Sequence, residues 1–141
     1  MTVPSHRGPI VIDTGVFGAD MVRRSELAER FEPVIAGRPA FISFQTAAEL
    51  HYGALRRGWG ERRVQQLRAK IASVEVVYAG PELVVVYAHL RAECARTGHA
   101  LSQRDHDADR WIAATAVRLG VPLVSDDGIF ADLPGLAVET A

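Results

Sequence analysis

The chain has 141 residues, of which 48% are hydrophobic and 23% charged, as expected for one soluble globular domain with its own core. No apolar run approaches the roughly 20 residues of a membrane span, and residues 1–9 hold no stretch of signal-peptide type, so we expect no membrane association, no export and a cytoplasmic location. The single cysteine excludes an internal disulfide framework, whereas the net charge of −1 leaves room for a local basic patch.

The first third of the chain is expected to begin with a loose lead-in at residues 1–8. The apolar run 9–13 predicts a buried strand followed by a turn into a helix. Apolar residues at near-helical spacing then predict a helix that ends before Gly37, and residues 40–43 predict a second strand.

The rest of the chain continues the alternation of helices and strands. We expect helices at 44–57, 61–72, 81–96 and 105–119, and strands at 74–78, 121–125 and, at an edge, 136–139. Strands separated by helices predict a mostly parallel sheet of four to five strands with helices on both faces, joined by right-handed crossovers. The whole chain, 1–141, is therefore expected to be a single α/β domain.

Four acidic residues fall at the predicted ends of strands or in the early turns of helices. Asp13 and Asp127 come at or just after the first and fourth strands, and Glu49 and Asp109 lie near the starts of two helices. Functional groups of open α/β sheets gather beyond the carboxyl ends of the strands. We therefore expect the four carboxylates to converge at one rim, where Gly53, one turn after Glu49, would let another segment approach.

Converging carboxylates need a reason, because like charges within a few ångströms repel one another. A divalent cation removes that conflict, and ligands that are all oxygen favour Mg²⁺ or Mn²⁺. A metal held by a few carboxylates, with water still bound, is equipped for phosphodiester hydrolysis. The pattern of acids therefore predicts a metal-dependent hydrolase.

Each acid also has an ordinary structural explanation. Asp13 could cap the following helix, and Asp127 could belong to a turn in Asp126-Asp127-Gly128. Glu49 could face solvent on its helix, and Asp109 could favour a helix N-terminus through the helix dipole. The joint placement of the four acids favours a site over these separate explanations.

In several motifs the chain resembles a known family, the PIN-domain ribonucleases, and in particular the VapC toxins of bacterial toxin–antitoxin operons. The resemblance rests on Val11-Ile-Asp13-Thr14, Ala48-Glu49-Leu50 with Gly53, Asp109-Arg-Trp-Ile-Ala-Ala-Thr-Ala116, and Pro122-Leu-Val-Ser-Asp-Asp127 with Phe130 and Pro134-Gly-Leu136. These motifs span nearly the whole chain in the order and spacing of the family.

The resemblance implies a single PIN-like α/β/α domain that cleaves RNA endonucleolytically with Mg²⁺ or Mn²⁺, inhibits translation and growth, and leaves 3′-hydroxyl and 5′-phosphate ends. By position, Asp13, Glu49, Asp109 and Asp127 would be the catalytic, metal-binding acids. It also implies a VapB-like antitoxin, whose C-terminal segment lies in an apolar groove among the first helices and the helix at 61–72, and a toxin homodimer within a larger toxin–antitoxin assembly.

The last motif departs from the pattern of the family. Ser125-Asp126-Asp127 has serine where threonine is usual and a doubled acid; Asp127 keeps the right distance to Phe130 and is preferred over Asp126. Ser125 and Thr14 are expected to support the acids as hydrogen-bonding neighbours. Asp107 is half a helical turn from Asp109 and should point elsewhere.

A basic segment with an aromatic residue offers a candidate RNA-binding surface. It consists of Arg56, Arg57, Trp59, Arg62 and Arg63, in which Trp59 would stack on a base. The same segment could instead be a solvated helical hairpin, or Trp59 could anchor a protein partner. Arg110, beside Asp109, is a further candidate for contact with RNA or with a neighbouring acid.

Several other functions conflict with the sequence. A haloacid-dehalogenase-type phosphatase needs Asp-X-Asp after its first strand, where this chain has Asp13-Thr-Gly15. A receiver domain needs a late lysine, yet the only lysine is Lys70, and there is no Gly-Lys-Ser/Thr of a P-loop. His51 and His106 are expected to be partly exposed or to form local hydrogen bonds rather than to act as bases. The alternative that stays open is a PIN-like module that binds RNA or protein without cutting.

Overall fold

The computed structural model describes residues 7–141, so the lead-in expected at residues 1–8 falls almost wholly outside the described residues. The strands are β1 (Ile10–Ile12), β2 (Ala40–Ser43), β3 (Glu75–Val77), β4 (Leu123–Val124) and β5 (Val138–Glu139). The helices are α1 (Thr14–Phe17), α2 (Ser25–Ile35), α3 (Phe44–Arg56), α4 (Glu61–Ala72), α5 (Pro81–Thr97) and α6 (Asp107–Leu119). Short 3-10 turns lie at Ala19–Met21 (η2), Ala100–Ser102 (η3), Arg104–His106 (η4) and Gly128–Phe130 (η5).

The five strands form one sheet in the order β3-β2-β1-β4-β5, and all four pairings are parallel. This confirms the α/β class and the expected mostly parallel sheet, with the edge strand included. The chain moves outward from β1 to β2 and β3 and then crosses to β4 on the other side of β1. The point where the order reverses therefore lies between β1 and β4, which is where open α/β sheets place their sites.

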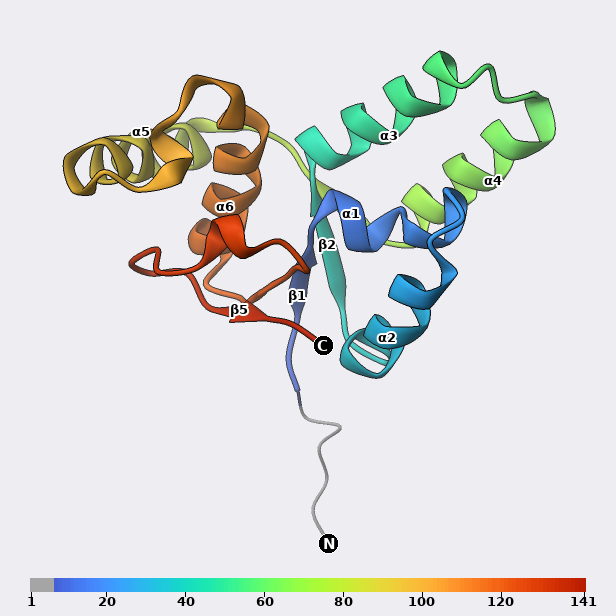
Figure 1. Cartoon of the computed structure of the whole chain (residues 1–141), viewed down its shortest axis with the longest axis horizontal. Coiled ribbons are helices and arrows are strands. Elements are labelled where there is room, and N and C mark those ends of the chain that lie inside the picture. The colour runs from blue at the N-terminus through green and yellow to red at the C-terminus, as the bar shows by residue number, and fades with distance from the viewer. Residues whose placement is uncertain (1–6) are drawn as a thin grey trace, which may run out of the picture.

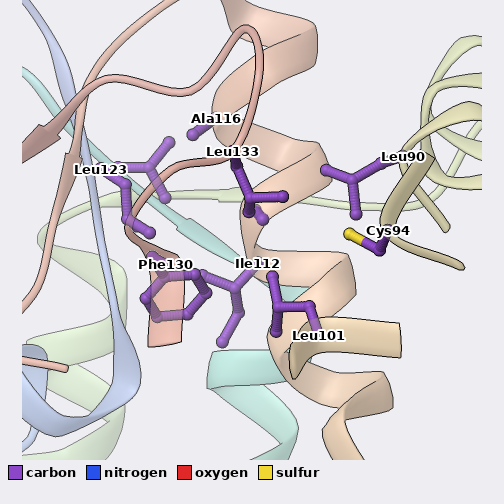
Figure 2. Packing of buried hydrophobic residues seen from close by; sticks show 10 residues of the cluster. Leu90, Cys94, Leu101, Ile112, Ala116, Leu123, Phe130 and Leu133 are labelled. Carbon is purple, nitrogen blue, oxygen red and sulfur yellow. The ribbon is translucent and has the colours of Figure 1, made fainter. Parts of the chain in front are cut away.

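Helices cover both faces of the sheet, with α5 and α6 on one side and α1, α2 and α4 on the other (Figure 1). Successive residues of a strand point to opposite faces. Accordingly Val11 packs into the α5–α6 side, and Ile10 and Ile12 pack into the other side. Figure 2 shows the first of these cores, in which Ile112, Leu123 and other side chains enclose Phe130. The expected three layers are thus confirmed.

Element boundaries differ from the prediction at α6 and β4. The helix expected at 105–119 begins at Asp107, because residues 104–106 form a separate 3-10 turn. The strand expected at 121–125 is limited to Leu123–Val124. Val121 instead takes part in the turn that closes α6, since its N–H donates to the carbonyl of Ala116 (3.2 Å) after Gly120 turns with φ of 68°. Within residues 7–141, none of the helices combines the length and the apolar character that crossing a bilayer requires.

A buried arginine ties the edge strand β5 to the start of the chain. Arg38 Nη1 donates to Glu139 Oε1 (2.7 Å) and its Nε donates to the carbonyl of Gly8 (2.8 Å). The Arg38 side chain is only 4% exposed, against 33% for Glu139. This hydrogen bond lowers the pKa of Glu139 below its ordinary value of 4.5, against the opposing effect of partial burial.

The Arg38–Glu139 pair makes a testable contribution to acid stability. Because the pKa of Glu139 is lower in the folded chain, its contribution is present above pH 4.5 and is lost as the pH falls through the folded value. We expect Glu139→Gln to lower the free energy of unfolding by about 1 kcal/mol at neutral pH, and by less near the acid limit. Urea titrations at several pH values measure this; a difference that does not shrink in acid would contradict the assignment.

Candidate active site

The four predicted acids line one cavity of about 360 Å³ at the carboxyl ends of the central strands. Asp13 follows β1 directly, and Asp127 follows β4 and precedes η5. Glu49 lies in the second turn of α3, and Asp109 lies in the first turn of α6. The helices α1 and α3 leave the same edge of the sheet, and α6 begins near it (Figure 1). The expected convergence of the four side chains is therefore seen in the structure.

Asp13 is the most buried of the four acids, with 7% of its surface exposed. Its Oδ1 accepts from the N–H of Val16 (2.9 Å), and its Oδ2 accepts from the hydroxyl of Ser125. Burial raises the pKa of the Asp13 carboxyl above its ordinary 3.8, and these two hydrogen bonds oppose the rise. The charges of Asp127 and Asp109 raise the pKa further. Asp13 thus caps α1, as one explanation held, and also faces the other acids.

Glu49 is more exposed and is held in place by two threonines. The hydroxyl of Thr14 donates to Glu49 Oε1 (2.9 Å), so the hydroxyl of Thr46, 2.9 Å from that of Thr14, must be the donor in the second bond. Partial burial raises the pKa of Glu49, and the Thr14 hydrogen bond opposes this. The structure thus places Thr14 beside an acid, where it was predicted to be; Thr46 is a partner that sequence patterns did not indicate.

Ser125 links the ends of β4 and β1. Its hydroxyl donates to Asp13 and accepts from the N–H of Asp127 (3.0 Å). Asp127 in turn accepts from the N–H of Ile129 (3.0 Å), so it caps η5 as the turn explanation suggested, while it also lines the cavity. The predicted supporting residue is therefore in direct contact with two of the predicted acids.

Asp109 is positioned by His106, whose Nδ1 lies 2.9 Å from Asp109 Oδ2. This is the local hydrogen bonding that was expected of His106. Asp107 points away from the cavity, as predicted, and accepts from Arg110 (3.2 Å) and from the hydroxyl of Tyr87. Asp126 also lines the cavity, but its carboxylate is paired with Arg30. Asp127 therefore remains the better candidate of the two adjacent acids.

The donor set fits a hard divalent cation in its chemistry, because four carboxylates supply only oxygen ligands and crowd one another electrostatically. Across residues 7–141, however, no three acidic, histidine or cysteine side chains already stand together as a formed metal site. The residues that would hold an ion are Asp13, Glu49, Asp109 and Asp127, which line the same cavity.

The chain comes close to α3 at Gly18, directly after α1. A Cβ added to Gly18 would lie 2.8 Å from Leu50 Cδ2 and 3.3 Å from the carbonyl oxygen of Thr14. Gly53 is expected from the sequence to admit another segment. A Cβ added to it would instead lie 2.8 Å from Nη1 of Arg57, at the end of the same helix. The expectation for Gly53 was wrong, and Gly18 is the glycine at which two segments meet.

The prediction that Arg110 contacts RNA is wrong. Its side chain is 2% exposed and donates to the carbonyls of Leu101 (2.6 Å) and Gln103 (2.7 Å), as well as to Asp107. A guanidinium that is buried and already bonded cannot reach a nucleic acid. The alternative contact, with a neighbouring acid, is the one that the structure shows.

The basic segment after α3 is only partly available. Arg56, Arg57 and Arg62 are exposed. Arg63 is exposed too, but it lies over the half-buried Trp59 ring, with its guanidinium carbon 4.0 Å from the ring centroid, and donates to the carbonyl of Met21 (2.6 Å). One face of Trp59 is therefore covered by its own chain.

Arg24 is a cavity residue that no sequence pattern indicated. It precedes α2 and lines the cavity of the four acids. It lies in the loop between η2 and α2, where periodicity gives no information about the direction of a side chain.

Comparison with known proteins agrees with this architecture. A family model described as PIN domain matches residues 10–136. The chain is 29% identical over 129 residues to Ribonuclease VapC5 of Mycobacterium tuberculosis, a match that covers 90% of this chain and 89% of that protein.

Solved structures show the same likeness. A chain of DNA-bound VapBC from Salmonella typhimurium superposes with a TM-score of 0.76 at 27% identity, over 94% of this chain and 97% of that one. A chain of VapBC2 from Rickettsia felis, bound to a DNA fragment from their promoter, superposes with a TM-score of 0.78 over 94% of this chain and 98% of that one. Its sequence identity is 20%, so this likeness supports the fold alone. Because the family model covers most of the sequence, the chain belongs to the PIN domain family.

Proposed function

We propose that this protein is the cytoplasmic toxin of a type II toxin–antitoxin system and that it cleaves RNA endonucleolytically with Mg²⁺ or Mn²⁺. The observation that carries the proposal is the gathering of four carboxylates, from four elements, around one cavity at the reversal point of a PIN-domain sheet. The likeness to a protein named a ribonuclease supports the reaction class.

In the proposed reaction, Asp13, Glu49, Asp109 and Asp127 would hold the cation. When bound, such an ion lowers the pKa of water and neutralises charge on a phosphate. One carboxylate of the cluster orients the attacking water and accepts its proton at a carboxylate oxygen. Thr14, Ser125 and His106 keep three of these carboxylates in position through the hydrogen bonds described above.

The partner of the proposed toxin is an antitoxin segment. A cavity of about 390 Å³ lies between α1, α2 and the end of α4, and its lining includes Val16, Phe17, Phe31 and Val74. Its place matches the apolar groove that the resemblance to VapC toxins implies. The similarity to a chain of the VapBC structure from Salmonella typhimurium supports such a partner. A toxin homodimer remains part of the same proposal.

Metal removal tests the proposed activity. We expect purified, antitoxin-free protein to cut total bacterial RNA at discrete positions with Mg²⁺ or Mn²⁺, and EDTA to abolish the cuts, because the carboxylates alone cannot activate water. Adaptor ligation that requires a 5′-phosphate, followed by sequencing, maps the sites and identifies the ends. Intact RNA under every metal, with RNA or partner binding retained, would instead support the non-catalytic module.

A further inference from the structure

The acid cavity is the middle of three adjoining hollows. On one side lies a hollow of about 310 Å³ that shares Thr14, Gly15 and Glu49 with it. On the other side lies a hollow of about 400 Å³ that shares Leu27 and Asp126 with it. Because they share wall residues, the three hollows lie next to one another across the site, and together they are called the groove below.

Arg24 lines all three hollows. Arg56 and Arg57 add positive charge to the first hollow. Arg23 adds it to the third, where Arg30 is paired with Asp126 and Glu26 opposes part of the charge, so that arginines outnumber acids in both outer hollows. The groove is therefore acidic in the middle and basic on both sides. A strand of phosphodiesters fits this order, because the outer arginines attract its phosphates while the central acids face the phosphate to be cut.

Tyr52 is an exposed aromatic residue of this groove. It lines the hollow with Arg56 and Arg57, and 65% of its surface is exposed. Trp59 lines the same hollow, but Arg63 covers one of its faces. A base that stacks on an aromatic side chain needs an open face, which Tyr52 supplies better than Trp59.

We infer that single-stranded RNA runs along this groove, with Arg24 binding a backbone phosphate beside the acids and Tyr52 stacking on a base on the Arg56–Arg57 side. The inference rests on the proposed function, which it extends from the reacting centre to the recognition of the strand. It replaces Trp59 by Tyr52 as the stacking residue and adds Arg24 as the central phosphate contact.

Binding measurements separate the two roles. We would titrate a labelled single-stranded RNA of mixed sequence with the full chain in EDTA, and follow its fluorescence anisotropy at several salt concentrations. Arg24→Gln should weaken binding several-fold and make the slope of log K against log salt less steep by about 0.7, as expected for one lost phosphate contact on a single strand. Tyr52→Ala should weaken binding roughly tenfold without changing the slope, and Tyr52→Phe should restore it.

Two exposed side chains outside the three hollows serve as controls. Arg68→Gln removes an exposed arginine of α4 that lines none of the three hollows, and Leu55→Ala truncates a side chain of α3 that is 80% exposed. Both should leave affinity and salt slope unchanged. An unchanged slope in Arg24→Gln, or a Tyr52→Phe variant as weak as Tyr52→Ala, would overturn the inference.

The outcomes distinguish a failure of the groove inference from a failure of the proposed nuclease activity. Metal-dependent cleavage with unaltered RNA binding in Arg24→Gln and Tyr52→Ala would keep the nuclease and reject the groove. Binding that changes as expected, in a protein that cuts no RNA, would keep the groove and reject the nuclease. Variants that bind RNA normally but lose an acidic protein partner would assign the groove to that partner, against the inference.

Discussion

Replacing Asp13 by asparagine is expected to lower the rate of RNA cleavage by at least about a thousandfold, since a bound metal supplies several kcal/mol of transition-state stabilisation. Asn keeps the shape of the side chain and can still accept from the N–H of Val16, so α1 should remain capped. Circular dichroism should show an unchanged fold, and single-turnover cleavage in Mg²⁺ measures the loss. Cleavage at the original rate would remove Asp13 from the reaction.

The same substitution should stabilise the metal-free chain at neutral pH. The pKa of Asp13 is raised in the folded state, so its protonated form is favoured there and its charged form weakens folding above the folded pKa. Asn mimics the neutral form. In EDTA, urea unfolding should therefore find Asp13→Asn more stable than the original chain near neutral pH, and this difference should fade in acid as Asp13 itself becomes protonated. Added Mg²⁺ should reverse the order by stabilising only the chain that binds it well.

Replacing Arg110 by alanine is expected to lower the free energy of unfolding by about 2–4 kcal/mol, since it leaves the buried carbonyl of Leu101 without this donor and empties the space of a side chain that is 2% exposed. Arg110 holds the carbonyls of Leu101 and Gln103, and these carbonyls belong to the segment that leads into α6. Without the guanidinium, both carbonyls lose a donor, and His106 loses the support that keeps it beside Asp109. Cleavage should therefore fall along with stability.

An arginine two turns further along the same helix provides the control. Arg118 is exposed and donates to Glu82 (3.2 Å), whose side chain is also exposed. Such a surface pair contributes about 0–1 kcal/mol, so Arg118→Ala should change the urea midpoint little. An equal loss of stability in Arg110→Ala and Arg118→Ala would show that the hydrogen bonds from Arg110 to the carbonyls of Leu101 and Gln103 contribute no more than the surface pair does.

Much of the fold follows from local patterns that packing reinforces. The three consecutive apolar residues of β1 point to alternate faces of the sheet and so enter two separate cores, and Gly120 ends α6 with a left-handed turn that a side chain would disfavour. The placement of Asp13 and Asp127 was predictable for a related reason, because parallel strands bring their carboxyl ends to the same rim. These are properties of the backbone, which sequence periodicity reports well.

The direction of long polar side chains was much less predictable. Arg110 follows a candidate acid in sequence, yet its position on α6 turns it toward the carbonyls of the preceding segment and buries it. Trp59 and Arg63 cover each other, which neither residue type alone indicates. Arg24 reaches the acids from a loop. Each of these outcomes depends on contacts between segments, and a single sequence holds no direct record of such contacts.

The wide separation of the four acids along the chain also affects when activity can arise during synthesis. Asp13 emerges from the ribosome early, but its partner Ser125 and the acid Asp127 are translated long after it. A nascent chain that lacks β4 has neither the strand beside β1 nor the last carboxylate of the cavity. If the protein is the nuclease proposed above, its activity can therefore arise only after β4 and Asp127 have been synthesised and β4 has paired with β1.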